Sequence, residues 1–176
     1  MRISLLAAAA ALMMLAGCAS DAQKGLCPAA AVLAPTSALT VFRAGAQPDP
    51  SAELYSVWMT DVKADCDFDK DARSANSHVS IEFAAKRAPS GEAASYNVPY
   101  FVAVTRGGDK IVSKKIFLAP VVFPAGASTI RFVQAIGSTT IRMARGAKIG
   151  DYQILTGLQL TQSQLEYNKT HHHYAP

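Results

Sequence analysis

The sequence predicts an all-β domain, an antiparallel β-sandwich of about seven to eight strands with a short C-terminal helical turn. Two observations carry this prediction. Apolar and polar residues alternate with a period of two over most of the chain after residue 27, as in strands with one buried face. Gly, Pro, Asn and Asp interrupt the alternation at short intervals, as turns between strands require. A small β-barrel is the alternative arrangement of the same strands.

Strands are expected wherever the alternation is clean. One covers 79–83, where the apolar residues share a face, and several others are expected to be bent or split. Pro120, residues 123–126 and the pair Gly137-Ser138 should interrupt the chain between strands. The other expected strands are 39–43, 53–68, 100–105, 110–117, 129–136, 140–143 and 151–160.

A hairpin is predicted around residues 106–109. Gly107 and Gly108 readily adopt the positive φ angles of a two-residue type I′ turn, and with that turn Val104 faces Ile111. Pro99 lacks an N–H group, so it should mark the start of its strand or a sheet edge.

The two ends of the domain give different signals. The Ala-rich segment 28–34 begins with Pro28, which suits either a helical turn or a segment lying across the sheet. Thr161 and Gln164 fit a capping box, which predicts a helical turn after the last strand. The predicted boundaries are therefore a single β domain over 27–168 and a disordered tail over 169–176.

The predicted architecture resembles immunoglobulin and fibronectin type III domains. Tyr152, after Gly150-Asp151, has the position of a tyrosine corner in such sandwiches. The order Cys27, Trp58, Cys66 departs from the Cys-Trp-Cys spacing of immunoglobulin domains.

The N-terminal residues have the pattern of a lipoprotein signal peptide. Arg2 supplies positive charge, residues 3–15 form an apolar run too short to span roughly 30 Å of hydrocarbon, and Leu15-Ala16-Gly17-Cys18 has the form of a lipobox. We expect residues 1–17 to be removed and Cys18 to become the first residue.

The resemblance to bacterial lipoproteins implies an anchor and a location. In that class the cysteine carries diacylglycerol and an acylated amine, so several acyl chains hold the protein on the membrane. Asp after this cysteine retains such proteins in the inner membrane. Ala19 at that position implies the outer membrane, with the domain facing the periplasm. Residues 18–26 then form the lipidated cysteine and a tether, which extends to at most about 30 Å.

The remaining cysteines predict a disulfide. Removing Cys18 from the three cysteines leaves Cys27 and Cys66, an even pair in an oxidising compartment. Neither lies in a Cys-x-x-Cys motif, so redox chemistry is the less favoured interpretation.

Charge limits the class of partner. The formal net charge is +4, and the basic residues are scattered apart from the adjacent pairs Lys86-Arg87 and Lys114-Lys115. These pairs give limited support for an anionic partner such as lipid headgroups or peptidoglycan, and none for nucleic acid. No cofactor is expected.

Four alternating aspartates are the first candidate for a metal site. In an extended chain their carboxylates project from one face, and oxygen-rich Ca²⁺ loops use similar spacing. An EF-hand loop would need Gly and Glu where the chain has Lys70 and Asn76, so a solvated loop is the competing interpretation. The aspartates are Asp65, Asp67, Asp69 and Asp71.

The second candidate is the tract His171, His172 and His173, whose imidazoles suit Zn²⁺, Cu²⁺ or Ni²⁺. A floppy polar tail near a chain terminus is the competing interpretation. His78, the one other histidine, is the residue on which a hydrolase would depend, inside a deep cleft beside Ser or Asp.

Exposed aromatic residues would give a binding face, although packing in the core explains aromatic residues in strands more often. The candidates are Trp58, Tyr96, Tyr100 and Phe101.

The chain as a whole resembles small proteobacterial outer-membrane lipoproteins, in the lipobox, the two later cysteines and the segment from Gly157-Leu158-Gln159-Leu160-Thr161 to Tyr167-Asn168. The resemblance implies no particular activity. We expect a non-catalytic envelope protein that contacts a protein partner or the cell wall, with docking on an exposed edge strand such as the one containing Pro99. The alternatives are a small-ligand or metal-binding accessory of envelope transport and a hydrolase.

Overall fold

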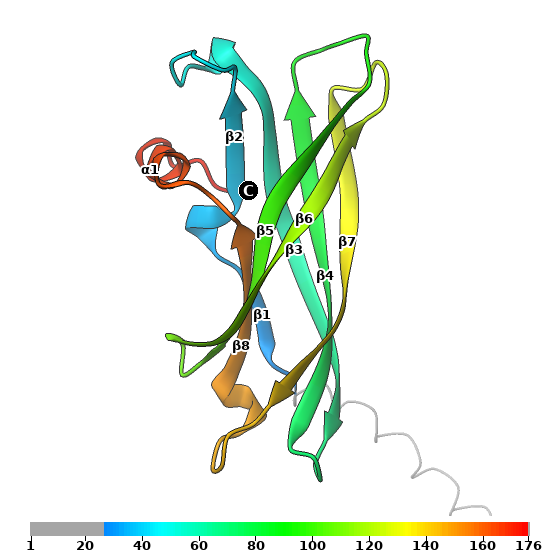
Figure 1. Cartoon of the computed structure of the whole chain (residues 1–176), viewed down its shortest axis with the longest axis vertical. Helices are drawn as coiled ribbons and strands as arrows, with labels where there is room; N and C mark the ends of the chain where they lie inside the picture. Colours follow the sequence, from blue (N-terminus) through cyan, green and yellow to red (C-terminus); the bar gives the residue numbers. More distant parts are fainter. Residues whose placement is uncertain (1–26, 176) are drawn as a thin grey trace, which may run out of the picture.

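The computed structural model describes residues 27–175 and confirms the predicted sandwich. Two four-stranded sheets pack face to face, and a single α-helix follows the last strand (Figure 1). The described strands do not close into the barrel that was the alternative. The lipobox, Cys18 and the tether lie outside the described residues.

The first sheet has the strand order β1-β8-β5-β6 and the second has β2-β3-β4-β7. Neighbouring strands are antiparallel except β1 and β8, which are parallel. The strands of the first sheet are β1 (Ala29–Val32), β8 (Tyr152–Leu158), β5 (Ala94–Arg106) and β6 (Lys110–Phe123). Those of the second are β2 (Ala38–Phe42), β3 (Glu53–Asp69), β4 (Ser74–Arg87) and β7 (Thr129–Arg142).

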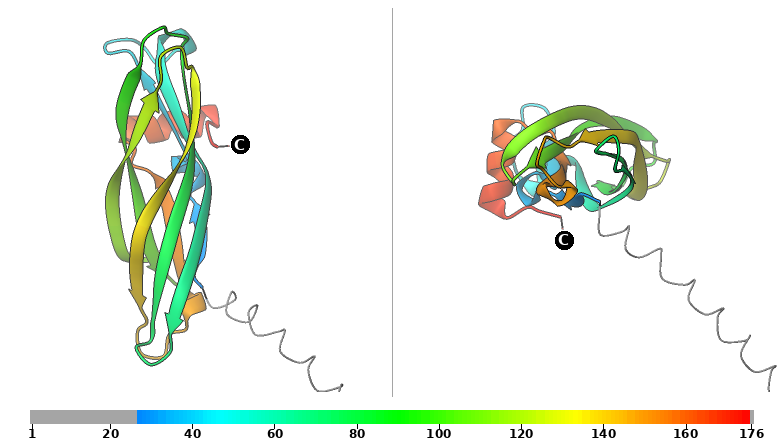
Figure 2. Two further views of the ribbon diagram at one scale, coloured as in Figure 1. Left: turned by 90° about the vertical axis from the view of Figure 1, so that its right-hand side faces the viewer. Right: turned by 90° about the horizontal axis from the view of Figure 1, so that it is seen from below.

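Helix α1 (Gln162–His171) lies beside β2 and the 3₁₀ turn η2 (Ala34–Thr36) (Figure 1), and the right-hand view of Figure 2 shows it outside the sandwich. Thr161 accepts a hydrogen bond from the Gln164 N–H, and Gln164 accepts one in return, so the predicted capping box is confirmed. Two further 3₁₀ turns are η3 (Pro50–Ala52) and η4 (Ile149–Asp151). No helix in the described part of the chain is long and apolar enough to cross a membrane.

Aromatic side chains fill the core between the sheets. Phe83 of β4 packs between Tyr100 of β5 and Phe132 of β7, with ring centroids 5.4 and 5.1 Å apart. The predicted inward face of residues 79–83 is confirmed, because Val79 and Ile81 are also buried. Contact between rings of both sheets fixes how the sheets stack.

A β-bulge divides β3. Met59 pairs with Phe83 and Asp61 with Glu82, so Thr60 is an extra residue without an opposite partner on β4. The odd-numbered residues up to Met59 point into the core, whereas after Thr60 the even-numbered residues do. The expectation that this long strand is bent is met by this bulge, which also turns the acidic half of β3 outward.

The predicted two-residue hairpin turn is wrong. Residues 107–109 form a three-residue loop, with Gly107 and Gly108 both at positive φ. Val104 pairs with Ser113 and not with Ile111, because Val112 is an extra residue in a bulge next to the loop. A glycine pair serves either loop length, so the sequence did not distinguish them.

Two predicted strand breaks are also wrong. Strand β6 continues through Pro120 to Phe123, which an edge strand tolerates because no second neighbour needs the missing N–H. Strand β7 continues through Gly137 and Ser138, which together lie opposite His78 in a bulge. Glycine inside a strand here marks a bulge and not a turn.

The predictions for Tyr152, for the Ala-rich segment and for the C-terminal tail can each be compared with the structure. Tyr152 is buried and its hydroxyl accepts a hydrogen bond from the Ala144 N–H at 2.9 Å, in the manner of a tyrosine corner. The Ala-rich segment forms β1 rather than a helical turn. The tail does not fray over residues 169–175: His173 bonds to Thr40, and the Ala175 N–H donates to Ser37.

The predicted disulfide is present. Cys27 and Cys66 are joined, with their Cα atoms 5.7 Å apart. Cys27 lies just before β1 of the first sheet, and Cys66 lies in β3 of the second. The bond therefore links the two layers of the sandwich.

Candidate interaction surfaces

Strand β6 presents an apolar surface to solvent. Ile116 and Leu118 are each 60% exposed, and Val122 is 53% exposed. They lie two or four residues apart, so they share the outer face of this strand with Val112 and Pro120. We call Val112, Ile116, Leu118, Pro120 and Val122 the β6 strip. Lys114 separates Val112 from the others, and the contiguous exposed apolar row from Ile116 to Val122 marks an interaction site.

The β6 strip lies on a sheet edge, because β6 pairs only with β5 among the described strands. Edge strands offer unpaired backbone N–H and C=O groups to an added strand. The expectation that the strand with Pro99 is an edge strand holds only for residues 94–98, which pair with β6 alone; from Tyr100 to Arg106, β5 pairs with both β8 and β6. Pro99 instead lies where the β8 ladder ends, its carbonyl accepting from the Gln159 N–H.

Lysines accompany the strip. Lys110, Lys114 and Lys115 lie on β6, and all three are exposed. The Lys114 ammonium lies 4.5 Å from the centroid of the Phe101 ring, which holds that lysine over the outer face of the first sheet. Lys114 therefore shares the outer face with the strip, whereas Lys115 lies on the opposite face of the same edge strand.

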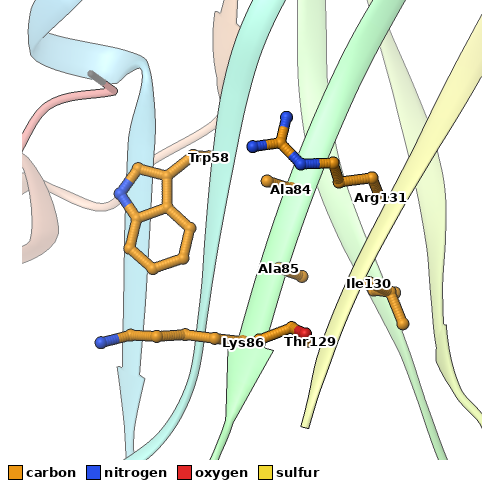
Figure 3. Close-up of a pocket in the computed structure, with 7 residues that line it drawn as sticks. All are labelled: Trp58, Ala84, Ala85, Lys86, Thr129, Ile130 and Arg131. Carbon is orange, nitrogen blue, oxygen red and sulfur yellow. The ribbon is translucent and has the colours of Figure 1, made fainter. Parts of the chain in front are cut away.

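A second surface lies on the outer face of the second sheet. Trp58 of β3, Ala84 of β4 and Arg131 of β7 are direct cross-strand neighbours, and Lys86 and Thr129 form the adjacent row. Because Ala84 carries only a methyl group, these side chains surround a hollow of 560 Å³ (Figure 3). We call these five residues the Trp58 hollow.

Each cation of the Trp58 hollow is paired with one glutamate. Arg131 Nη1 donates to Glu82 at 3.0 Å, and Lys86 Nζ lies 3.6 Å from Glu53. Lys86 Nζ also lies 5.5 Å from the Trp58 ring centroid. The cations remain accessible, since the Lys86 and Arg131 side chains are 49% and 71% exposed.

A chain of hydrogen bonds runs beneath one edge of this surface. The Ser56 hydroxyl donates to the Glu53 carboxylate at 2.6 Å, so its oxygen must accept from Thr40, 3.0 Å away. Thr40 has then used its only proton, and it accepts from Nε2 of His173 at 3.0 Å. These bonds assign the Nε2–H tautomer to His173 and connect the C-terminal segment to Glu53.

Burial lowers the pKa of His173 below its ordinary value of 6.5. Lys86 and His171 lower this pKa further, whereas the negative charge of Glu53 raises it. The imidazole also packs against Trp58, with ring centroids 5.8 Å apart. His173 is therefore held neutral near pH 7 between the helix and the second sheet.

The aspartates do not converge on a single point. Asp65, Asp67 and Asp69 alternate along the outer face of β3 and are exposed, and Asp71 lies in the following turn. Residues two apart on a strand are roughly 6.6 Å apart, too far for neighbouring side chains to meet one ion as a compact ligand loop does. The described residues contain no group of three His, Cys, Asp or Glu that could hold a metal ion.

The histidines of the C-terminal tract diverge. His171 stacks on Tyr167, His172 ends α1 in the left-handed conformation, and His173 contacts Trp58 and Thr40. Consecutive residues point in different directions at a helix end, so the three imidazoles do not share one site.

The other candidate residues have separate locations. His78, which a hydrolase would need in a deep cleft, is exposed on the outer face of β4, opposite the bulge of β7. Of the four aromatic candidates, Tyr100 is in the core, Tyr96 stacks on Tyr55, and Phe101 is buried in the first sheet. Trp58 lines a surface hollow of the described part of the chain.

Sequence reasoning missed both surfaces. Residues 116–123 are apolar on both faces of the strand apart from Pro120, a signal for a strand covered on both sides. The fold covers only one of these faces. The Trp58 hollow depends on the register of three strands, which no local pattern encodes.

Comparisons with known proteins add no further assignment. Neither the protein-family models nor the curated proteins nor the solved structures gave a match.

Proposed function

We propose that the protein is a lipid-anchored, non-catalytic lipoprotein of the bacterial envelope that binds a protein partner along β6. The β6 strip is the observation that carries this proposal, because exposed apolar side chains at a free sheet edge serve recognition. A disulfide between two sheets agrees with an oxidising compartment. In this proposal Cys18 carries the lipid, and the domain faces the periplasm from the outer membrane.

The chemistry of β6 defines the partner. Strand addition supplies main-chain hydrogen bonds, while side chains facing the same way decide which sequence fits. Lys110, Lys114 and Lys115 favour acidic residues on the added strand, since opposite charges across a ladder stabilise the pair. A second copy of β6 carries no acidic residue to pair with these lysines. We therefore infer an extended partner segment of alternating apolar and acidic residues.

Crosslinking in living cells tests this proposal. A photoreactive amino acid at Leu118 of the full chain should give a discrete protein adduct, whose crosslinked segment is apolar and acidic. Lys114→Glu together with Lys115→Glu should weaken that adduct by charge repulsion. The matched control is a photoreactive residue at Val133, which is 63% exposed on β7 of the other sheet. The same products from both positions, or lipid products alone from Leu118, contradict the proposal.

The anchor has a separate test. Cys18→Ser should abolish labelling by a fatty-acid probe and release the protein from the membrane fraction, because a chain without lipid lacks the acyl contacts that hold it. Cys27→Ser is the control, and it should retain the label. Membrane-bound, labelled Cys18→Ser protein would contradict lipidation at this residue while leaving the crosslinking result interpretable.

A further inference from the structure

We propose that the Trp58 hollow binds the ring of an acidic sugar, a pyranose carrying a carboxylate, within a polysaccharide that lies across the second sheet. This site is separate from the β6 strip, which belongs to the other sheet. The inference therefore does not depend on a protein partner.

The hollow is large enough for one ring. Its 560 Å³ falls within the roughly 300–1,000 Å³ typical of ligand sites. Ala84 forms the floor, the Trp58 indole stands on one side, and the guanidinium of Arg131 stands on the other (Figure 3). An open hollow admits one residue of a longer chain, which continues across β7, because His173 and α1 cover the sheet beyond Trp58.

The side chains match the two kinds of surface that a sugar acid presents. The indole supplies a flat apolar face for the C–H groups of a pyranose ring. Arg131 and Lys86 supply positive charge for a carboxylate, and guanidinium groups pair with carboxylates through two parallel hydrogen bonds. The Thr129 hydroxyl can donate to or accept from a ring hydroxyl.

The existing ion pairs leave donors for the ligand. Among the described residues, Arg131 donates only from Nη1, to Glu82, which leaves Nε and Nη2. The Glu53 side chain is less exposed than that of Lys86, and its carboxylate also accepts a hydrogen bond from Ser56, in the chain of hydrogen bonds that leads to His173. These carboxylates orient the cations without occupying all of their hydrogen-bonding groups.

Charge on the same sheet sets the direction of the polysaccharide. Beyond the Thr60 bulge, the outer face of β3 carries four carboxylates and one cation, Lys63, which pairs with Asp61, so its net negative charge repels an anionic chain running along the strand; the carboxylates are Asp61, Asp65, Asp67 and Asp69. The row Trp58, Ala84, Arg131 instead crosses three strands at nearly one level. The polysaccharide therefore crosses the strands.

The tryptophan itself reports binding. Trp58 is the only tryptophan in the chain, so its emission monitors the hollow without a label. Oligogalacturonate, titrated into the purified full chain in detergent, should change this emission saturably. The uncharged galactose oligomer of equal length should bind at least about tenfold more weakly, because it lacks the charge-assisted hydrogen bonds.

Two substitutions separate this site from a general surface effect. Ala84→Leu fills the floor of the hollow and should abolish the saturable change in Trp58 emission. Ala135→Leu, at an exposed position of β7 in the same sheet, should leave that change intact. Arg131→Gln should weaken binding about tenfold. Unchanged melting temperatures of these variants establish that each is folded.

Several results would overturn the proposal. They are the absence of a saturable change, equal affinity for the neutral oligomer, or unaltered binding by Ala84→Leu. Equal or tighter responses to a nucleoside diphosphate or to vesicles containing phosphatidylglycerol would assign the hollow to another anion and also overturn it.

Discussion

Nε2 of His173 lies 3.0 Å from the hydroxyl of Thr40, although 133 positions separate the two residues. The bond attaches the segment after α1 to β2 of the second sheet. A second attachment comes from Asn168, which is buried and donates from Nδ2 to the carbonyl oxygens of Pro35 and Ala38. The C-terminal segment is thus part of the domain and not an appendage.

Acid should loosen this segment. Since the folded state lowers the pKa of His173 below 6.5, it disfavours the protonated imidazole relative to the unfolded chain. This contribution to stability is complete above pH 6.5 and is lost as pH falls through the lowered folded-state pKa. The protection of residues 162–175 against hydrogen exchange, measured relative to the intrinsic exchange rate at each pH, should therefore fall between pH 7.5 and pH 5.

His173→Gln separates titration from hydrogen bonding. The glutamine amide can still donate to Thr40 but does not gain a proton, so the protection of residues 162–175 in this variant should depend less on pH than in the natural chain. His78→Gln, at an exposed histidine, should retain the natural pH dependence. Equal pH dependence in the natural chain and His173→Gln would contradict the role of this imidazole.

Removing the tyrosine hydroxyl should destabilise the domain. Tyr152→Phe leaves the Ala144 N–H without the hydroxyl 2.9 Å away, at a cost of about 1 kcal/mol in the free energy of unfolding. Urea denaturation measures this change. Tyr96→Phe is the matched control, since the Tyr96 hydroxyl makes no hydrogen bond to the described residues. The prediction fails when both variants unfold at the same urea concentration.

The disulfide should make a large contribution to stability. Cys27 and Cys66 are 39 positions apart, and closing such a loop in the unfolded chain corresponds to about 4 kcal/mol on the chain-entropy model. Cys27→Ser with Cys66→Ser should lower the free energy of unfolding by up to that amount. Adding reductant should shift the natural chain toward the double variant and leave the variant unchanged. A reductant effect of equal size on both proteins would refute this explanation.

Gly157 should tolerate no side chain. A Cβ atom there would lie 2.0 Å from Oγ1 of Thr36 and 3.0 Å from a ring carbon of Phe101. Gly157→Ala should therefore cost about 1–3 kcal/mol, the usual range for overpacking. Thr36→Ala, which removes that oxygen, should restore part of the loss. At Gly150 the added atom would meet no neighbour within 4 Å, so Gly150→Ala is the control. Similar melting temperatures for the two glycine variants would exclude the steric explanation.

The sequence predicted where the strands lie better than which of their residues face the core. Alternation identifies a strand at residues 53–68, yet it does not reveal that Thr60 is an extra residue. One such residue exchanges the buried and exposed faces beyond it. Without the bulge, Asp61 and Asp65 would share the face of Met59 and enter the core. The need to keep these carboxylates in water is the physical reason for the bulge.

The Trp58 hollow could not be predicted from the sequence, because it forms only when three strands pair in the observed register. Trp58 was among the aromatic residues considered from the sequence, but Ala84 and Arg131 lie 26 and 73 positions after it. Their shared row arises from the pairing of β3 with β4 and of β4 with β7. The disulfide was predictable because cysteine parity is independent of register.

The covalent bond between Cys27 and Cys66 also determines how the domain bears mechanical load. A pull on the chain before Cys27 reaches β1 through the backbone and β3 through the sulfur atoms, so both sheets share the force at once. Stretching β1 away from β8 cannot extend the chain while the sulfur bridge holds Cys27 against β3. In a domain tethered at this end, the segment from Cys27 to Cys66 could not be drawn out until the bridge itself is reduced.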